Sequence, residues 1–259
     1  MIGDVWSAKK GASIPGRNIS TGESISKAVL QKRLTGLEEE RALLDEYPAE
    51  EYAEIVRDTG FSCTCCGRCC TKEVNDHVFL LDEDVRRIRP VHPDVLVPAP
   101  YFEACDQNGR FYVSGYALKT QDGNLCTFLD DSMRCRIYAD RPLICRVYPY
   151  MLHREENASG DLRWCHLSGL NTHGEYNESI SPEDAASIAE ETIRYEKAYL
   201  DQQIAFFRAL LDLFEKEGFR YVRRTYDLAM RDFCRGEPVR VMVFFDGRFE
   251  EAVVSRDMY

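Results

Sequence analysis

The chain has 259 residues, of which 44% are hydrophobic and 30% charged, and its formal net charge is -11. This size suits one large domain or one domain with a helical extension, and no apolar run approaches the length of a membrane span. The acidic balance argues against the basic face that nucleic-acid binding usually needs, so we expect neither a nucleic-acid nor a membrane partner.

The N-terminal part of the chain is predicted to be an arm followed by two helices. Residues 1–22 are rich in glycine, serine and lysine, which indicates a weakly ordered arm. Leucines at near-helical spacing over 23–47 predict a helix that Pro48 ends. A shorter helix is predicted over 49–58, with Gly60 as its C-terminal cap.

The middle of the chain is predicted to hold short strands and loops. Residues 78–81 form a candidate strand, and a short helix is expected directly after it. Three prolines within 91–100 favour an extended loop, whereas 111–120 is predicted as a strand with a turn at Asp122-Gly123. Two further segments are expected to pair across a turn, 147–153 and 161–164.

The C-terminal part is expected to form two helices and a β-hairpin. Ser181 is a good N-cap ahead of Pro182. An apolar stripe over 200–214 indicates a helix that needs a partner, and a second helix is predicted over 219–235. Two apolar strands joined by Asp246-Gly247 predict the hairpin.

These elements predict an α+β fold. Its core would be a loop-rich, cysteine-lined metal-binding region with short strands, flanked by an antiparallel helical pair and a C-terminal β-hairpin. The predicted parts are an N-terminal arm and helix (1–47), a cysteine-cluster domain (48–180), and a C-terminal helical hairpin with the β-hairpin (181–259).

The cysteines are the strongest functional signal. The chain has 11, and five of them lie within eight residues, from Cys63 to Cys70. The first residues contain no apolar run of the kind a signal peptide needs, which predicts a cytoplasmic, reducing setting. In that setting clustered cysteines favour metal or redox chemistry over disulfides. The odd number also fits poorly with a fully paired disulfide framework.

Three groups of cysteines carry the metal-binding pattern. A C-x-x-C loop places two sulfurs on one side of a tight turn, and Gly67 gives such a turn its backbone freedom. The first group is Cys63, Cys66, Cys69 and Cys70, with Cys65 as an extra member; the second is Cys126 and Cys135; the third is Cys145 with Cys165.

Thiolate ligands limit the candidate metals but do not identify a single one. Soft sulfur ligands suit zinc, iron in iron–sulfur clusters, or copper(I). The C-x-x-C-x-x-C spacing resembles the first three ligands of a ferredoxin-type run. The resemblance ends there, because the fourth cysteine follows directly instead of after three residues. The sequence also lacks the C-x-x-x-C-x-x-C spacing of radical S-adenosylmethionine enzymes. Adjacent Cys69 and Cys70 point to opposite sides of an extended backbone, which favours two sites of four thiolates, although one cluster with spare thiols also fits.

Charged and histidine residues near the cysteines are weaker candidates for a role at the metal site. Arg141 and Arg146 are candidates to offset the negative charge of a thiolate-bound metal, and a solvated loop explains them equally well. For Arg68, Arg134 and Arg136 we favour the solvated loop. His166, next to Cys165, and His77, with Glu73 and Asp76 nearby, are less favoured as ligands than as ordinary structural residues.

Two segments resemble the YkgJ-type cysteine-cluster family, a zinc- or iron-chelating domain with a CxxCxxCC signature. They are CTCCGRCC at 63–70 and LCTFLDDSMRCRIYADRPLICRVYP at 125–149. The resemblance covers roughly residues 60–168 and implies a set of metal ligands: Cys63, Cys66, Cys69, Cys70, Cys126, Cys135, Cys145 and Cys165. Cys65, Cys105 and Cys234 lie outside the family pattern.

The resemblance implies metal chelation but no single reaction. Our leading interpretation is a cytoplasmic protein that holds an iron–sulfur cluster of the 4Fe–4S type, with two metal sites as an option, and that has a redox or electron-transfer role. The alternatives are a structural zinc module whose helices bind a protein partner, or a protein-modifying enzyme. The last follows from family members linked to flagellin lysine N-methylation, and no glycine-rich nucleotide loop supports it independently.

Overall fold

The computed structural model describes residues 27–72, 74, 76–121, 124–156, 162–166 and 173–259. The side chains of 153–156 and 162–166 are not among the described parts. The predicted arm at 1–22 and the turn at Asp122-Gly123 therefore lie outside the described residues. No helix in the described part of the chain combines the length and the apolar character needed to cross a bilayer.

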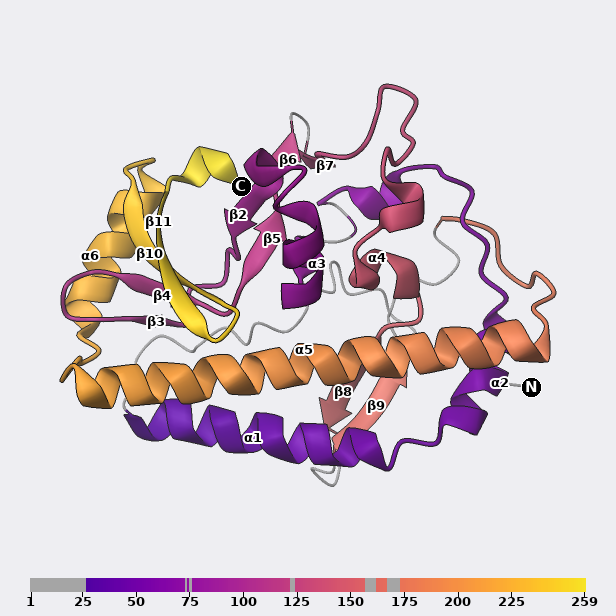
Figure 1. Ribbon diagram of the computed structural model, residues 1–259, viewed down its shortest axis with the longest axis horizontal. Coiled ribbons are helices and arrows are strands. Elements are labelled where there is room, and N and C mark those ends of the chain that lie inside the picture. The colour runs from indigo at the N-terminus through magenta and orange to yellow at the C-terminus, as the bar shows by residue number, and fades with distance from the viewer. Residues whose placement is uncertain (1–26, 73, 75, 122–123, 157–161, 167–172) are drawn as a thin grey trace.

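The longest element is α5 (Pro182–Lys216), which runs along the whole molecule (Figure 1). Ser181 is its N-cap, as predicted, and its Oγ accepts a hydrogen bond from the backbone N–H of Asp184 at 3.0 Å. Helix α1 (Lys27–Asp45) lies beside α5. Helix α2 (Ala49–Thr59) also packs against α5.

The apolar stripe predicted over 200–214 finds its partner in α1. Leu30 and Leu34 of α1 share one buried core with Phe207 and Leu210 of α5. Exposed ion pairs follow the same antiparallel order, from Lys27–Glu215 at one end to Lys197–Asp45 at the other. The antiparallel pair flanking the core is thus α1 with α5. The two C-terminal helices do not form it, because α6 (Arg223–Cys234) packs against the sheet strand β10 (Val239–Phe245).

The larger sheet carries the predicted C-terminal hairpin. Strand β10 pairs antiparallel with β11 (Arg248–Val254), and the positive φ angles of Asp246 and Gly247, 49° and 76°, make the turn. On its other side β10 pairs parallel with β4 (Phe111–Val113), which pairs with β3 (Ala104–Cys105). The α+β class and the hairpin are confirmed.

The segment predicted as one strand over 111–120 is divided between three sheets. After β4 it continues as β5 (Tyr116–Leu118) and β6 (Thr120–Gln121). The break at Ser114-Gly115 has a cause in α5, because the buried Gln202 Nε2 donates to the Ser114 carbonyl at 3.2 Å. A Cβ at Gly115 would lie 2.8 Å from that same nitrogen.

Short elements complete the region next to the cysteines. Strand β5 is the middle strand of a three-stranded sheet, and β6 pairs with the strand that carries Cys126. The remaining elements are β1 (Phe79–Leu80), β2 (Leu96–Pro98), β7 (Leu125–Cys126), the pair β8 (Leu152–Glu156) and β9 (Leu162–His166), and the helices α3 (Asp82–Ile88) and α4 (Leu143–Val147). Helix α4 and the turn after it occupy part of the segment predicted as a strand over 147–153.

Candidate metal centre

Backbone pairing fixes both ends of the first cysteine loop. At its start, Ser62 and Glu175 exchange N–H···O bonds of 2.8 and 2.9 Å. At its end, Thr71 bridges to Leu125, and the Lys72 N–H donates to the Asn124 carbonyl at 3.0 Å. Because Leu125 precedes Cys126, this second attachment brings the first group of cysteines beside the second group.

The first loop also packs tightly on the loop over 126–135. Gly67 has a φ of 72°, and a Cβ there would lie 2.7 Å from Met133 Cε and 3.1 Å from the Met133 carbonyl oxygen. Only a glycine allows this approach without displacing the second loop. Gly67 therefore serves the contact between the two cysteine loops as well as the turn predicted from the sequence.

The second loop is closed by its own hydrogen bonds. Asp130 Oδ1 accepts the backbone N–H groups of Ser132 and Arg134 at 2.8 and 2.9 Å, which is an Asx-type turn. An isolated bridge between Leu129 and Cys135 completes the closure. Cys126 and Cys135 are thus held at the two ends of a compact loop.

The third group is held by a buried carboxylate on α3. Asp84 is 3% exposed, and its two oxygens accept the N–H of Leu143, at the start of α4, at 3.3 and 3.2 Å. Arg87 donates to Asp84 at 2.8 Å and to the Arg141 carbonyl at 3.0 Å. Burial raises the pKa of Asp84. These bonds fix the position of α4, which carries Cys145.

Six of the predicted ligands each lie in electrostatic range of at least two others. Burial raises the pKa of Cys145 well above its ordinary value, and the neighbouring Cys126, Cys70 and Cys135 raise it further. Cys63 acts on both Cys69 and Cys135 in the same sense. The set drawn together from three segments is Cys63, Cys69, Cys70, Cys126, Cys135 and Cys145.

Cys69 and Cys70 are hydrogen-bonded to each other. Their sulfurs are 3.9 Å apart. The hydrogen bond between them lowers the pKa of Cys70 to about 7 and raises that of Cys69, whose burial raises it further. The pair therefore favours one thiolate, on Cys70, with the proton held on Cys69.

Four predicted ligands share a local hydrogen bond from the backbone two residues onward. The N–H of Cys65 lies 3.4 Å from Cys63 Sγ. The corresponding donors to the other three sulfurs are Arg68 for Cys66, Phe128 for Cys126 and Ile137 for Cys135. Each of these three bonds favours the thiolate over the thiol, and N–H···S bonds of this kind tune metal–thiolate centres.

Cys66 lies at the exposed edge of the group. The Arg68 N–H lowers its pKa most, and donors from Thr64 and Gly174 lower it further. Tyr148 lies in electrostatic range of both Cys66 and Cys69. Its hydroxyl is 2.6 Å from Nε2 of the buried His173.

Two further cysteines, Cys105 and Cys234, lie outside the three predicted groups. Cys105 is buried on β3, and Cys234 is exposed at the end of α6. The side chains of Cys165 and His166 are outside the described parts, although the backbone of Cys165 pairs with His153 in the β8–β9 ladder. No disulfide joins any of the ten cysteines whose side chains are described.

The donor set fits a soft metal, but the side chains are not drawn into a metal-binding arrangement. Within the described residues, no three Cys, His, Asp or Glu side chains form a group that could hold an ion. The fit rests on donor chemistry: six sulfurs gathered from three segments, with backbone N–H groups supplied to the thiolates. These are the ligands that zinc and iron–sulfur clusters take.

The two candidate arginines are placed differently. Arg141 lowers the pKa of Cys70, Cys135 and Cys145 through its charge, and its guanidinium lies 3.8 Å from the ring centroid of Tyr138. Arg146 instead pairs with Glu191 on α5. The structure therefore places Arg141, and not Arg146, beside the cysteines.

His77 lies next to Cys70 and Cys126, at a small cavity. Together with Lys72 and Asp76 it lines a cavity of about 10 Å³ whose wall includes Cys70 and Cys126. Such a space holds no more than one water molecule. The mixed site considered at His77 thus adjoins the cysteines, whereas Glu73 lies outside the described residues.

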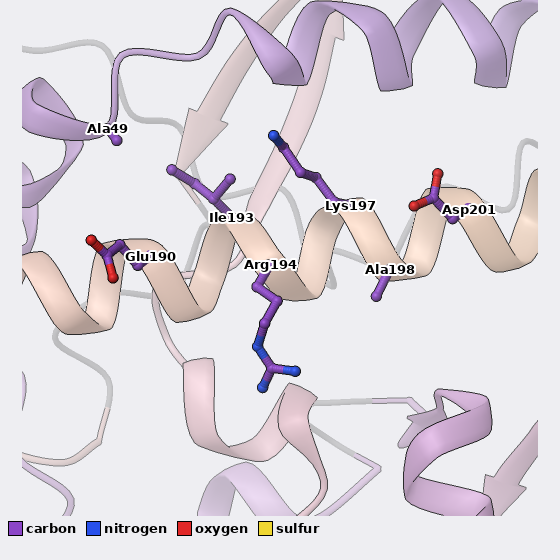
Figure 2. A pocket seen from close by; sticks show the side chains of 7 residues that line it. All are labelled: Ala49, Glu190, Ile193, Arg194, Lys197, Ala198 and Asp201. Carbon is purple, nitrogen blue, oxygen red and sulfur yellow. The ribbon is translucent and has the colours of Figure 1, made fainter.

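A larger pocket of about 460 Å³ lies along α5, where residues of that helix and Ala49 line it (Figure 2). Three of its charged side chains have partners: Lys197 pairs with Asp45, Arg194 with Glu83, and Asp201 with Arg41. No cysteine lines it. We therefore place the functional site at the cysteines and not in this pocket.

Comparison with known proteins supports the same region. Residues 62–166 match the family model CxxCxxCC, described as "Putative zinc- or iron-chelating domain", which confirms the resemblance found in the sequence. An uncharacterized protein of Methanocaldococcus jannaschii is 33% identical over 92 residues, which are 35% of this chain and 44% of the relative. The chain thus spans less than half the length of that relative. No solved structure matches.

Proposed function

We propose that this chain is a cytoplasmic protein that binds an iron–sulfur cluster of the 4Fe–4S type through its cysteine thiolates and has a redox or electron-transfer role. The observation that carries this proposal is the gathering of six thiols from three segments. A single zinc ion takes four ligands, so six to eight cysteines exceed its need. A cluster with remaining thiols, or two metal sites, uses them better.

The surroundings of the thiols support a negatively charged centre. The backbone donors at Cys126 and Cys135, and the charge of Arg141, all favour the thiolate form. Burial opposes that form at Cys145, and a bound metal would replace the proton there. Because no preformed site exists among the described residues, binding on this proposal includes a local rearrangement of the cysteine side chains.

The alternative is a structural zinc site in a module that binds a protein partner. The knuckle at Cys63 and Cys66, with backbone N–H donors to both sulfurs, favours it, because zinc ribbons use the same spacing. A protein-modifying enzyme is a third candidate that no described residue independently favours. On each proposal the expected partner is a protein, and neither nucleic acid nor a membrane.

Anaerobic purification followed by metal and acid-labile sulfide analysis separates the candidates. The iron–sulfur proposal predicts a brown protein that contains iron and sulfide in equal amounts and bleaches in air. A colourless protein with stoichiometric zinc and no sulfide would contradict it and support the zinc module. Binding of S-adenosylmethionine by the metal-loaded protein would instead favour the modifying enzyme.

A further inference from the structure

We propose that the outward face of α6 is a docking surface for a protein partner that presents an acidic segment. Four side chains define this face, which we name the α6 stripe: Arg224, Leu228, Arg231 and Arg235. None of the predicted metal ligands belongs to it. The proposal therefore holds whichever metal the chain binds.

The α6 stripe lies opposite the buried side of the helix. Tyr226, Met230 and Phe233 pack into the core beside β10. The stripe residues follow one another at spacings of four, three and four, which places them together on the other face. All four are exposed, and α6 lies at the edge of the molecule (Figure 1). The stripe is thus open to a partner.

The charge of this region is opposite to that of the chain. Residues 220–240 contain six arginines and three acidic residues, whereas the whole chain has 33 basic and 44 acidic residues. All six arginines are exposed. In the part of the chain that the structure describes, only Arg223 among them has a carboxylate partner, Asp227, at 3.6 Å between Nε and Oδ2. The three arginines of the α6 stripe therefore carry positive charge that no described carboxylate offsets.

The positions of these arginines do not favour the helix itself. The first turn of α6 contains Arg223 and Arg224 and no acidic residue, although the positive end of the helix dipole lies there. The negative end of the dipole accounts for Arg231 and Arg235 individually, but like charges four residues apart destabilise a helix. An acidic partner would offset all of these charges at once.

The chemistry of the α6 stripe identifies the kind of partner. Guanidinium groups bind carboxylates through two parallel hydrogen bonds, and arginine is enriched at protein interfaces. The stripe extends from Arg224 to Arg235, about 17 Å of helix. Leu228 lies near its middle and is 40% exposed. The stripe therefore fits an acidic segment of similar length that carries an apolar side chain between its carboxylates.

Other polyanions fit the α6 stripe less well. A helix that binds a bilayer inserts its apolar face, but the apolar face of α6 is already packed against the sheet. Nucleic acid extends beyond so small a patch and would meet the net negative charge of the rest of the chain. A compact acidic segment of a protein avoids both costs.

Fluorescence anisotropy with a defined acidic peptide tests the proposal on the full-length protein as purified. The probe is a short labelled peptide of glutamates around a central leucine, and the same peptide with glutamine for glutamate is its control. We expect saturable binding of the glutamate peptide alone, which weakens as salt screens the exposed charges. Absence of binding at low salt, or equal binding of the glutamine peptide, would overturn the proposal.

Two charge reversals locate the binding surface. Arg231→Glu should weaken peptide binding by about tenfold, because it replaces an attraction by a repulsion. Arg57→Glu, at an exposed residue of α2, changes the net charge equally and should leave binding unchanged. Equal losses in the two variants would overturn the proposal. Thermal unfolding checks that both variants are folded, and Arg231→Gln replaces Arg231→Glu if that variant is not.

Two competitors test the class of partner. A DNA duplex and vesicles that contain phosphatidylserine are each added to the complex of the protein with the glutamate peptide. We expect neither to displace the peptide at equal charge concentration. Displacement by either one would overturn the assignment to a protein partner. Since the α6 stripe contains no metal ligand, these results are independent of the metal and sulfide analysis that tests the proposed function.

Discussion

Gly67→Ala is the sharpest perturbation of the contact between the two cysteine loops. The alanine would have to keep a φ of 72°, which costs an L residue roughly 1–2 kcal/mol. Its Cβ would meet three atoms of Met133: the flexible Cε at 2.7 Å, and Cβ and the backbone oxygen, each at 3.1 Å. The side chain can move aside, but the backbone oxygen moves only with its loop.

We therefore expect Gly67→Ala to destabilise the protein by about 2 kcal/mol, the sum of the left-handed φ and a small displacement of the second loop. For a protein of this size that lowers the thermal midpoint by roughly 4–8 °C. If the same energy must be spent to dock the loops around a metal, metal affinity falls by at least about tenfold. Thermal unfolding and chelator competition measure the two effects.

A matched control is available at Gly36, inside α1. A Cβ at Gly36 would have nothing within 4 Å, so Gly36→Ala should stabilise the helix by about 0.5–1 kcal/mol and leave metal affinity unchanged. The double variant Gly67→Ala/Met133→Ala should recover only part of the loss, because the backbone contact remains. Wild-type stability and metal affinity in Gly67→Ala would refute the inferred contact.

Three further predictions concern the ligands and their support. Cys145→Ser should lower metal content and thermal stability together, while Cys234→Ser should change neither. Metal analysis and calorimetry test this. Full metal content in Cys145→Ser would mean that Cys145 is not a ligand. Burial raises the pKa of Cys126 to about 11 and raises that of Cys145 well above its ordinary value. In the metal-free protein these two thiols therefore hold their protons at neutral pH, and metal affinity should rise as the pH rises. Chelator competition at several pH values measures it, and a flat profile would contradict the thiol ligands. Asp84→Ala should lower the free energy of unfolding by about 2–3 kcal/mol, because it leaves a buried backbone N–H without its acceptor. Glu83→Ala, at an exposed side chain, should lower it by no more than about 0.5 kcal/mol. Equal losses in denaturant unfolding would count against the support of α4 by Asp84.

Local patterns predicted much of this molecule. The Ser181 cap, the Gly60 cap and the Asp246-Gly247 hairpin depend on residues that act on their own neighbours in the chain, and each lies where it was expected. The cysteine spacing likewise located the loop at 63–70 and its glycine. Signals of this kind need no knowledge of the rest of the fold.

Long-range packing decided the features that were missed. The partner of the stripe at 200–214 is a helix more than 150 residues away, and several amphipathic segments offered a suitable face. The strand at 111–120 is broken by Gln202, whose hydrogen bond to Ser114 spans 88 residues. Asp84 gave no signal as the support of α4, because its partner Leu143 lies 59 residues further on. The backbone donors to Cys126 and Cys135 could have been anticipated, since a bond from residue i+2 is local.

X-ray absorption at the metal edge of the loaded protein tests the central claim most directly. If cysteines from the three segments bind the metal, the first coordination shell consists of sulfur at roughly 2.3 Å, and its sulfur count falls in Cys145→Ser. A first shell of oxygen or nitrogen, or a sulfur shell that Cys145→Ser leaves unchanged, would contradict the account.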